Sequence, residues 1–483
     1  MNWTSSVRNR IVLPLVTSFW IISVDAQIRN FTTTGEQITK FDNRGDAVDA
    51  HDGMIAYFDG IYYLYGTSYD CGFEWQNNSA PFCGFKSYSS KDMTHWKDEG
   101  FLFDAQNELW QSRCDGKTYG CFRPHVVYNR KDKQYVLWIN VYDNVVGYRV
   151  FTSRTPVGPF VEVSEPKVAI NNDKPAAGLN NGDHDVFVDD DGTAYLAMTD
   201  WRATGAIAIE QLTDDYLSGT GKFVLNVTEG KTEAPGLFKR KGIYYVTYSD
   251  PNCGYCSGTG TSYKTAKSPL GQWSEGKKIS PNSCGGQPSF VATLKLSKDT
   301  VLLYGSDLWN NAAKNEALAN FYWAPLAFEE DGSIKPMDCL PSFQRPGAKA
   351  HSSSDNVEGY RALCDITSKQ NYQSSFAPDR SGKLVNVDIV TLKSGNPDAD
   401  LIVDFYEVGS RDKVLTTVMV PRNSIGWSAK SITIRPNIAV SKRKKYVIVL
   451  RTDSNTGCYG YAKNVTSNTI KSGKNFKYST TVK

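Results

Sequence analysis

Residues 51–68 read HDGMIAYFDGIYYLYGTS, and this stretch decides how the chain folds. It opens near a polar residue, Asp52, continues as a short apolar segment, turns at Asp59-Gly60, and ends in a second segment rich in tyrosine. Two such segments around an Asp-Gly pair are typical of a β-hairpin, because the tight turn needs residues that tolerate positive φ. We therefore expect two antiparallel strands here.

The same pattern recurs four more times. The further copies open at Arg123, Asp183, Glu233 and Gln287, and successive copies start 50 to 71 residues apart, which leaves room for two additional strands in each copy. Units of four strands repeated around an axis are the blades of a β-propeller. The sequence therefore predicts an all-β protein whose first domain, residues 27–340, is a five-bladed β-propeller.

The pattern changes after the fifth copy. Alternating segments such as KLVNVDIVTL and KYVIVL indicate a second all-β unit, which we expect to be a β-sandwich domain over residues 350–483. At the other end of the chain, basic residues precede the apolar run IVLPLVTSFWIISV, and small residues follow it up to Ala26. Residues 1–26 are therefore predicted to be a secretory signal peptide, and the mature protein is expected to be extracellular.

The cysteines fit an oxidising compartment, and there are ten of them. Their spacing favours three disulfides, which are Cys71–Cys83, Cys114–Cys121 and Cys364–Cys458. The pairing of the other four stays open, namely Cys253, Cys256, Cys284 and Cys339. After the predicted signal peptide, four N-x-S/T sequons also predict surface loops able to carry glycans, at Asn30, Asn77, Asn226 and Asn464.

Charge and hydropathy exclude two classes of partner. The formal net charge is only +3 with acids and bases interspersed, so no nucleic-acid partner is expected. No segment after the signal approaches the roughly 20 apolar residues of a membrane span, so no membrane partner is expected after the signal is removed.

A propeller brings the residues that open its repeats together. The innermost strand of every blade runs along the central axis, so the ends of these strands converge on one mouth of the channel. We expect the five opening residues to face one another across a polar funnel: Asp52, Arg123, Asp183, Glu233 and Gln287. Carboxylates gathered there perturb one another's pKa values, because like charges disfavour ionisation and an arginine favours it.

Residues from about 46 to 335 resemble glycoside hydrolase family 43, whose members are five-bladed propeller enzymes. The resemblance is carried by the Asp52 repeat and by SSKDMTHWKDEG, DHDVFVDDDG, EAPGLFKRKGIYYVTYS and TAKSPLGQW, in that order. It implies that Asp52 is the general base, Glu233 the general acid, and Asp183 the residue that orients the acid and adjusts its pKa. In an inverting hydrolase the acid protonates the leaving oxygen, while the base, about 6.5–9.5 Å away, deprotonates the attacking water.

The finer resemblance is to the exo-β-1,3-galactanase branch of that family. It rests on RPHVVYN, CGYC, GGQPS, YGSDLWN and YWAPLAF. In that branch the first-blade base is typically absent, a Glu precedes the Arg-Pro of blade two, and the Gln of GGQPS has been proposed as an unusual base. Here Phe122 stands at the position of that Glu and Asp52 is present, so Gln287 is expected to be a substrate contact or structural hub rather than a base.

The resemblance implies a carbohydrate substrate, and galactan is favoured over arabinan or xylan. We expect a monomer. The candidate substrate-binding residues are Gln287, Arg123, Phe122, Trp201, Trp309 and Asp307. No cofactor and no metal are expected, since the spacing of the histidines fits no named metal motif.

Less specific interpretations stay open for several of these residues. Asp52 could be a turn residue at a strand entry. Asp185 lies two residues after Asp183, on the same strand face, and could be the true partner of the acid. Trp201 and Trp309 could belong to the core between blades, where we place Trp96 and Trp273. For the whole protein, a propeller that binds sugar without cleaving it is the alternative.

Overall fold

The computed structural model describes residues 27–74, 80–115, 120–141, 147–171, 181–251, 258–296, 299–309, 315–344, 359–409, 413–465 and 476–483. Within these ranges the fold is all-β, with one α-helix, α1 (Glu108–Cys114), and short 3-10 turns at η2 (Ala169–Asn171), η3 (Trp201–Ala203), η5 (Glu316–Leu318) and η6 (Arg422–Ser424). No helix among the described residues is long and apolar enough to cross a membrane.

Five antiparallel sheets form the first domain, as predicted. Blade 1 contains β2 (His51–Phe58), β3 (Ile61–Thr67), β4 (Phe85–Ser90) and β5 (Lys97–Phe101). Blade 2 contains β6 (Cys121–Asn129), β7 (Gln134–Val141), β8 (Gly147–Ser153) and β9 (Val161–Ser164). Blade 3 contains β10 (Asn181–Val188), β11 (Ala194–Asp200), β12 (Ala206–Leu212) and β13 (Gly219–Val224). Blade 4 contains β14 (Glu233–Arg240), β15 (Ile243–Ser249), β16 (Thr261–Ala266) and β17 (Lys277–Ser280).

Blade 5 differs from the prediction of four strands. In the described residues it has three: β18 (Gln287–Lys295), β19 (Thr300–Leu308) and β20 (Asn320–Pro325). A single bridge between Phe328 and Ile334 follows in place of a fourth strand. Outside the blades, β1 (Gln27–Arg29) pairs with β21 (Ser342–Gln344) in a separate two-stranded sheet.

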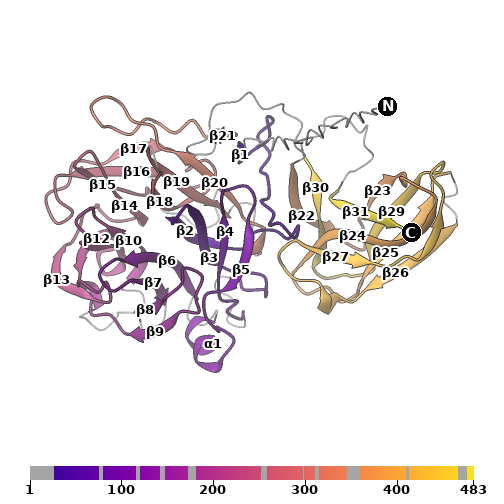
Figure 1. The fold of residues 1–483 in the computed structure, drawn as a ribbon, viewed down its shortest axis with the longest axis horizontal. Coiled ribbons are helices and arrows are strands. Elements are labelled where there is room, and N and C mark those ends of the chain that lie inside the picture. Colours follow the sequence, from indigo (N-terminus) through magenta and orange to yellow (C-terminus); the bar gives the residue numbers. More distant parts are fainter. Residues whose placement is uncertain are drawn as a thin grey trace, which may run out of the picture.

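The inner strands β2, β6, β10, β14 and β18 are neighbours in a closed ring, and the sheets are arranged around it in Figure 1. Apolar side chains fill the spaces between adjacent blades. Trp96 is 1% exposed and packs beside Trp323 between blades 1 and 5, and Trp273 lies against the cluster of blades 3 and 4. Both tryptophans therefore have the core positions predicted for them.

Two sheets form the second domain, as expected for a β-sandwich. One contains β22 (Tyr360–Ile366), β24 (Gly382–Ser394), β27 (Lys430–Ile434), β28 (Ile438–Val440), β30 (Cys458–Asn464) and β31 (Tyr478–Val482). The other contains β23 (Tyr372–Phe376), β25 (Leu401–Glu407), β26 (Val414–Val420) and β29 (Tyr446–Thr452). Alternate residues of β29 are buried, which is the period-2 pattern that KYVIVL predicted. The boundary between residues 340 and 350 falls partly outside the described residues and stays a prediction.

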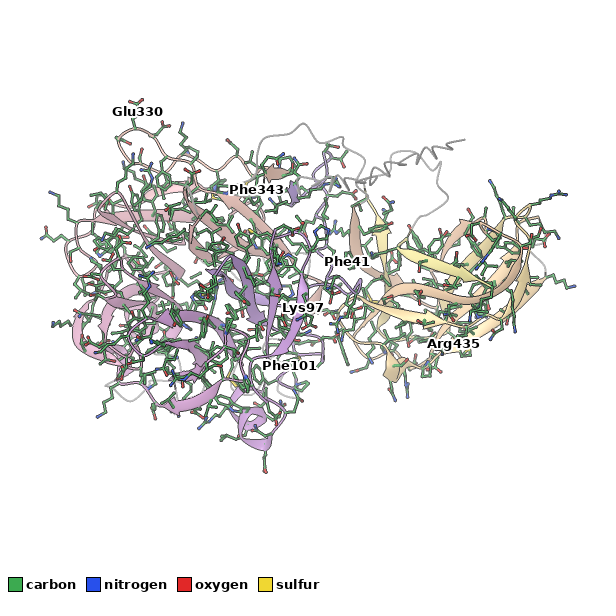
Figure 2. All side chains as sticks on the ribbon, in the orientation of Figure 1. Phe41, Lys97, Phe101, Glu330, Phe343 and Arg435 are labelled. Carbon is green, nitrogen blue, oxygen red and sulfur yellow. A yellow bond between two sulfur atoms is a disulfide. The ribbon has the colours of Figure 1, made fainter. Side chains whose placement is uncertain are left out.

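The sandwich is docked on the propeller beside blade 1 (Figure 1). Thr39 N–H donates to the Tyr360 carbonyl at 2.8 Å, and Ala47 N–H donates to the Ala429 carbonyl at 2.7 Å. Phe41 lies where the two domains meet in Figure 2, with Lys477 Nζ 5.0 Å from its ring centroid. Because main-chain hydrogen bonds and apolar contacts both cross this interface, the domains form a specific contact rather than a loose tether.

The three predicted disulfides are confirmed, and a fourth joins Cys284 to Cys339, whose pairing the sequence left open. Cys253, Cys256 and Asn77 lie outside the described residues. The prediction that Asn30 lies in a surface loop is wrong: its side chain is fully buried, and Nδ2 donates to the carbonyls of Trp323 (2.8 Å) and Leu340 (3.2 Å). Of the other two sequons, Asn226 is exposed, whereas Asn464 closes a strand.

Candidate active site

The five inner strands begin at one end of the channel, which we call the mouth, and each has an irregularity in its first residues. Pairing with the next strand shifts within every one of these starts. Asp52, Arg123 and Ala234 there have positive φ values of 56°, 58° and 54°. Such bulges re-aim side chains near active sites, and here they turn chemically active groups toward the axis.

The bulges also correct the predicted equivalence of the opening residues. Glu233 pairs with Ser249, and Gln287 pairs with Asp307, each at the first residue of its inner strand. The corresponding first residue in blade 1 is His51, not Asp52. Phe122 and Asn181 take the corresponding places in blades 2 and 3. The five residues therefore gather at one mouth but do not occupy equivalent positions, and they lie in two layers. Glu233 and Gln287 are half-buried, whereas Asp52, Arg123 and Asp183 are 3 to 7% exposed.

Asp52 is the centre of the buried layer. Its Oδ1 accepts a hydrogen bond from Thr67 Oγ1 at 2.8 Å, and its Oδ2 accepts one from Tyr69 OH at 3.1 Å. Burial raises the pKa of Asp52 to about 7, with Arg123 opposing this shift and the negative charges of Asp307 and Asp183 adding to it. A turn residue would be exposed, so the interpretation of Asp52 as a simple turn is not supported.

Arg123 holds the buried layer together. Its Nη2 lies 2.8 Å from Asp183 Oδ2, and its Nη1 donates to the carbonyls of Pro288 (3.1 Å) and Ser289 (3.4 Å). Burial works against its charge, but Asp183 and Asp52 outweigh that effect and raise the pKa of Arg123 above its usual value. The guanidinium is therefore a permanent cation beside the carboxylates.

Two of the predicted substrate contacts are as buried as Asp52 and have partners within the protein. Asp307 is 2% exposed and accepts hydrogen bonds from Asp52 N–H (3.1 Å) and from Ser289 Oγ. Arg123 is 3% exposed. Because hydrogen-bonding groups of the protein already surround both, they support the Asp52 region from within, and direct contact of either with sugar stays a prediction.

The half-buried layer is a chain of three side chains. Gln287 Nε2 donates to Glu233 Oε1 at 2.5 Å, and Trp309 Nε1 donates to Gln287 Oε1 at 3.1 Å. An indole N–H can only donate, so it fixes the orientation of the Gln287 amide and points the amide N–H group at Glu233. Gln287 therefore positions the carboxyl of Glu233, which agrees with its expected role as a hub rather than a base.

We expect the Trp309→Phe substitution to lower kcat/KM about tenfold, because loss of one hydrogen bond of this kind leaves the Gln287 amide free to rotate away from Glu233. Steady-state kinetics at constant pH measures the effect. Trp273→Phe is the control, since that side chain packs between blades 3 and 4. A Trp309→Phe enzyme with unchanged kcat/KM would contradict this role.

Aromatic side chains form one wall of the mouth. The Phe73 and Phe122 rings meet edge-on with centroids 5.9 Å apart, and the Tyr69 and Trp309 rings do so at 6.0 Å. Trp201 follows β11, and its indole lies so close to Gly182 that a Cβ there would sit 2.6 Å from Nε1. The structure thus brings the predicted aromatic residues to strand ends around the mouth, and stacking of a sugar on them stays a prediction.

Sequence reasoning missed Thr67 and Tyr69, which bind the Asp52 carboxylate, and Asp49, which supports them. Asp49 accepts hydrogen bonds from Ser68 Oγ (2.5 Å) and from the backbone N–H of Tyr69 (2.9 Å). The sequence offered one indication, because Asp49 lies just before the first repeat, residues 51–68, and Tyr69 lies just after it. Their mutual contact, however, depends on the pairing of β2 with β3.

His125 and Asp185 are structural partners. His125 Nδ1 lies 3.0 Å from Asp185 Oδ1, and Leu237 N–H donates to Asp185 Oδ2 at 2.7 Å. Asp185 is therefore occupied away from the mouth, and Asp183 is the carboxylate that joins Arg123. Burial lowers the pKa of His184 well below its ordinary value, so this side chain is neutral. Among the described residues, no cluster of His, Cys, Asp or Glu has metal-site geometry.

A separate hollow of about 1640 Å³ lies at the opposite end of the inner strands. It is lined by the hairpin turns of the blades, including residues 59–60, 189–193 and 239–241. Asp52, Asp183 and Glu233 do not line it. The carboxylates needed for acid–base chemistry are gathered at the mouth, so the mouth is the candidate active site.

The model of the glycosyl hydrolases family 43 matches residues 45–293, which is more than half of the chain and runs from the start of blade 1 into the first strand of blade 5. The chain belongs to glycosyl hydrolase family 43. This family 43 protein is 27% identical over 265 residues to a β-D-galactofuranosidase of Aspergillus niger, a match that covers 53% of this chain and 74% of that protein.

Solved structures share the same fold. A family 43 β-1,3-galactosidase with galactodeoxynojirimycin is 25% identical, with a TM-score of 0.50, over 62% of this chain and 97% of that one. An exo-β-1,3-galactanase from Phanerochaete chrysosporium with β-1,3-galactotriose is 18% identical, with a TM-score of 0.52, over 90% of this chain and 99% of that one. This family 43 glycosidase therefore shares its fold with galactan-cleaving enzymes, and the second match spans both domains.

Proposed function

We propose that this family 43 glycosidase hydrolyses β-1,3-galactosyl linkages of a galactan with inversion at the anomeric carbon, with Glu233 as general acid and Asp52 as general base. The observation that carries the proposal is the pairing, at one mouth, of two differently held carboxyl groups. Glu233 is half-buried and oriented by Gln287, whereas Asp52 is buried and has a pKa of about 7. Pairs of carboxyl groups in contrasting environments are typical of glycosidases.

In this mechanism the Glu233 carboxyl donates its proton to the glycosidic oxygen while the bond from that oxygen to the anomeric carbon breaks. A water molecule attacks the same carbon from the opposite face and gives its proton to Asp52. The Asp52 pKa near 7 suits this step, since a base works best when its pKa lies near the working pH. The hydrogen bonds from Thr67 and Tyr69 fix the carboxylate in place.

Asp183 and Arg123 contribute the electrostatic setting. The two side chains form an ion pair, with Arg123 Nη2 2.8 Å from Asp183 Oδ2. The positive charge of Arg123 lowers the pKa of Asp52, and the negative charge of Asp183 raises it. Arg123 favours the ionised base, while Asp183 and Asp307 favour the protonated form. The balance keeps Asp52 able to take up a proton and to release it again near neutral pH.

The choice of a galactan rests on the similarity to the β-1,3-galactosidase and on the sequence motifs of the galactanase branch. A panel of β-1,3-galactobiose, aryl β-D-galactopyranoside, aryl β-D-galactofuranoside, aryl α-L-arabinofuranoside and xylobiose tests it. We expect the highest kcat/KM on β-1,3-galactobiose. Preference for the furanosides or for xylobiose would contradict the substrate, and glycan binding without hydrolysis of any glycan would favour the sugar-binding alternative.

We further propose that the protein is exported after removal of residues 1–26. The support is the predicted signal peptide together with four disulfides in the described residues, which form in oxidising compartments. N-terminal sequencing of the mature protein is expected to begin at Gln27. A mature chain that retains the apolar run would contradict this.

A further inference from the structure

A short segment of the β-sandwich lies against a loop of the mouth. Residues 426–430, which follow η6 and end in the first residue of β27, meet the loop 68–73 that follows β3 of blade 1. Ser428 N–H donates to Asp70 Oδ1 at 2.7 Å, and Lys430 Nζ forms an ion pair with the same carboxylate. We call residues 426–430 the clamp and residues 68–73 the mouth loop.

Trp427 adds an apolar contact to the polar ones. A Cβ on Gly72 would lie 2.7 Å from the Trp427 ring, so only glycine, which also has a φ of +89°, leaves room for it. Lys393 Nζ lies 4.4 Å from the centroid of the same ring, and Asn315 Nδ2 donates to the Trp427 carbonyl at 3.3 Å. Trp427 is thus held by Lys393 of the sandwich and Asn315 of the propeller, with its ring against the mouth loop.

The mouth loop leads directly to both carboxyl groups of the site. Tyr69 OH donates to Asp52 Oδ2, and the Tyr69 ring meets the Trp309 ring edge-on. Trp309 in turn orients Gln287 and so Glu233. Tyr69, Phe73, Phe122, Trp309 and Trp427 belong to one apolar cluster. A displacement of the loop would therefore reach the base through Tyr69 and the acid through Trp309.

We propose that the sandwich domain is a working part of the active site: the clamp positions the mouth loop so that Tyr69 and Trp309 hold Asp52 and Glu233 in place. Trp427 and Lys430 are positioning residues that act through Gly72 and Asp70. The kinetic consequence rests on the proposed function, whereas the ordering of the loop does not.

The test uses the full-length protein with Trp427→Ala, Trp427→Phe, Lys430→Met and Lys430→Arg. The control is Thr39→Val, which removes another interdomain hydrogen bond, the 2.9 Å contact from Ala362 N–H to Thr39 Oγ1, outside the clamp. Three measurements are made on each variant. They are hydrogen exchange of residues 68–73, kcat/KM on β-1,3-galactobiose, and the pH at which kcat/KM falls on the acidic side.

We expect Trp427→Ala and Lys430→Met to speed exchange in the mouth loop and to lower kcat/KM about 10- to 100-fold, the cost of a small misplacement of catalytic groups. The acidic limb should move to higher pH, because Asp52 loses the Tyr69 hydrogen bond that favours its ionised form. Trp427→Phe and Lys430→Arg should stay near wild type, as should Thr39→Val.

Unchanged loop exchange in both clamp variants would overturn the proposal, as would faster exchange with unchanged kcat/KM and pH profile. Equal losses in Thr39→Val would overturn it too, since they would reflect general weakening of the interface. If Trp427→Ala fails to fold, Lys430→Met tests the same contact through Asp70. If the wild-type protein cleaves no glycoside, both the proposed function and the catalytic role of the clamp are contradicted. Hydrogen exchange of residues 68–73 would still show whether the clamp orders the mouth loop.

Discussion

Asp52→Asn is expected to abolish hydrolysis and, at pH 8, to make the protein more stable. Loss of a general base costs about 10²- to 10⁴-fold in kcat. The gain in stability follows from the pKa of about 7 that burial gives this carboxyl, against 3.8 as its ordinary value. A shift of that size corresponds to about 2 to 4 kcal/mol of unfolding free energy, which asparagine recovers because it has no charge to bury.

The gain has a defined pH dependence. Between about pH 4 and pH 7 the folded protein holds the Asp52 proton and the unfolded chain has lost it, so the wild type loses stability as the pH rises through this window. The advantage of Asp52→Asn should therefore be near zero at pH 4 and reach its full value above pH 7. Urea unfolding of both proteins at pH 4.5 and pH 8 measures it.

Asp189→Asn is the matched control with the opposite sign. Asp189 is also buried but lies in the turn after β10, where Lys239 and Tyr244 donate to it at 2.7 and 2.5 Å. These hydrogen bonds outweigh burial and lower the pKa of Asp189. Its replacement should cost stability at pH 8 and leave kcat/KM unchanged. An Asp52→Asn protein that is less stable than wild type at pH 8 would contradict the assigned environment of Asp52.

Glu233→Gln carries the second large effect. Glutamine cannot donate an acidic proton, so we expect kcat on β-1,3-galactobiose to fall about 10²- to 10⁴-fold. A dinitrophenyl β-galactoside has a leaving group that departs without protonation, and its hydrolysis should fall far less. Steady-state kinetics on both substrates measures the difference.

Glu229→Gln is the control for Glu233, since this exposed carboxylate lies in the same chain segment and pairs with Lys264. It should behave as wild type on both substrates. Equal losses of Glu233→Gln on the disaccharide and the dinitrophenyl glycoside would mean that Glu233 binds or positions the sugar rather than protonating the leaving oxygen.

The sequence predicted the blades well because each one is a local pattern. The apolar segments and turns that begin at Asp52 and recur at Glu233 need only neighbouring residues to form hairpins, so period and turn chemistry suffice. The fourth strand predicted for blade 5 is reduced to one bridge at Phe328, which hydropathy alone does not show. Asn30 failed as a surface sequon because its partners, Trp323 and Leu340, are about 300 residues away in the chain.

The sequence predicted which residue types form the site, but not the division of these residues into a buried and a half-buried layer. A bulge in the first residues of a strand leaves the alternation of the following residues intact, so the sequence could not show that Asp52 lies one position further along its strand than Glu233 does along its own. The contacts of Tyr69 with Asp52 and of Trp427 with Gly72 arise from tertiary structure alone.

The most direct test of the account is the configuration of the sugar first released from β-1,3-galactobiose, followed by proton NMR before mutarotation. With Asp52 activating water opposite the Glu233 proton donor, α-galactose should appear first, and Asp52→Asn should abolish this signal. Release of β-galactose first, or undiminished release by Asp52→Asn, would contradict the pairing of Asp52 and Glu233 as base and acid.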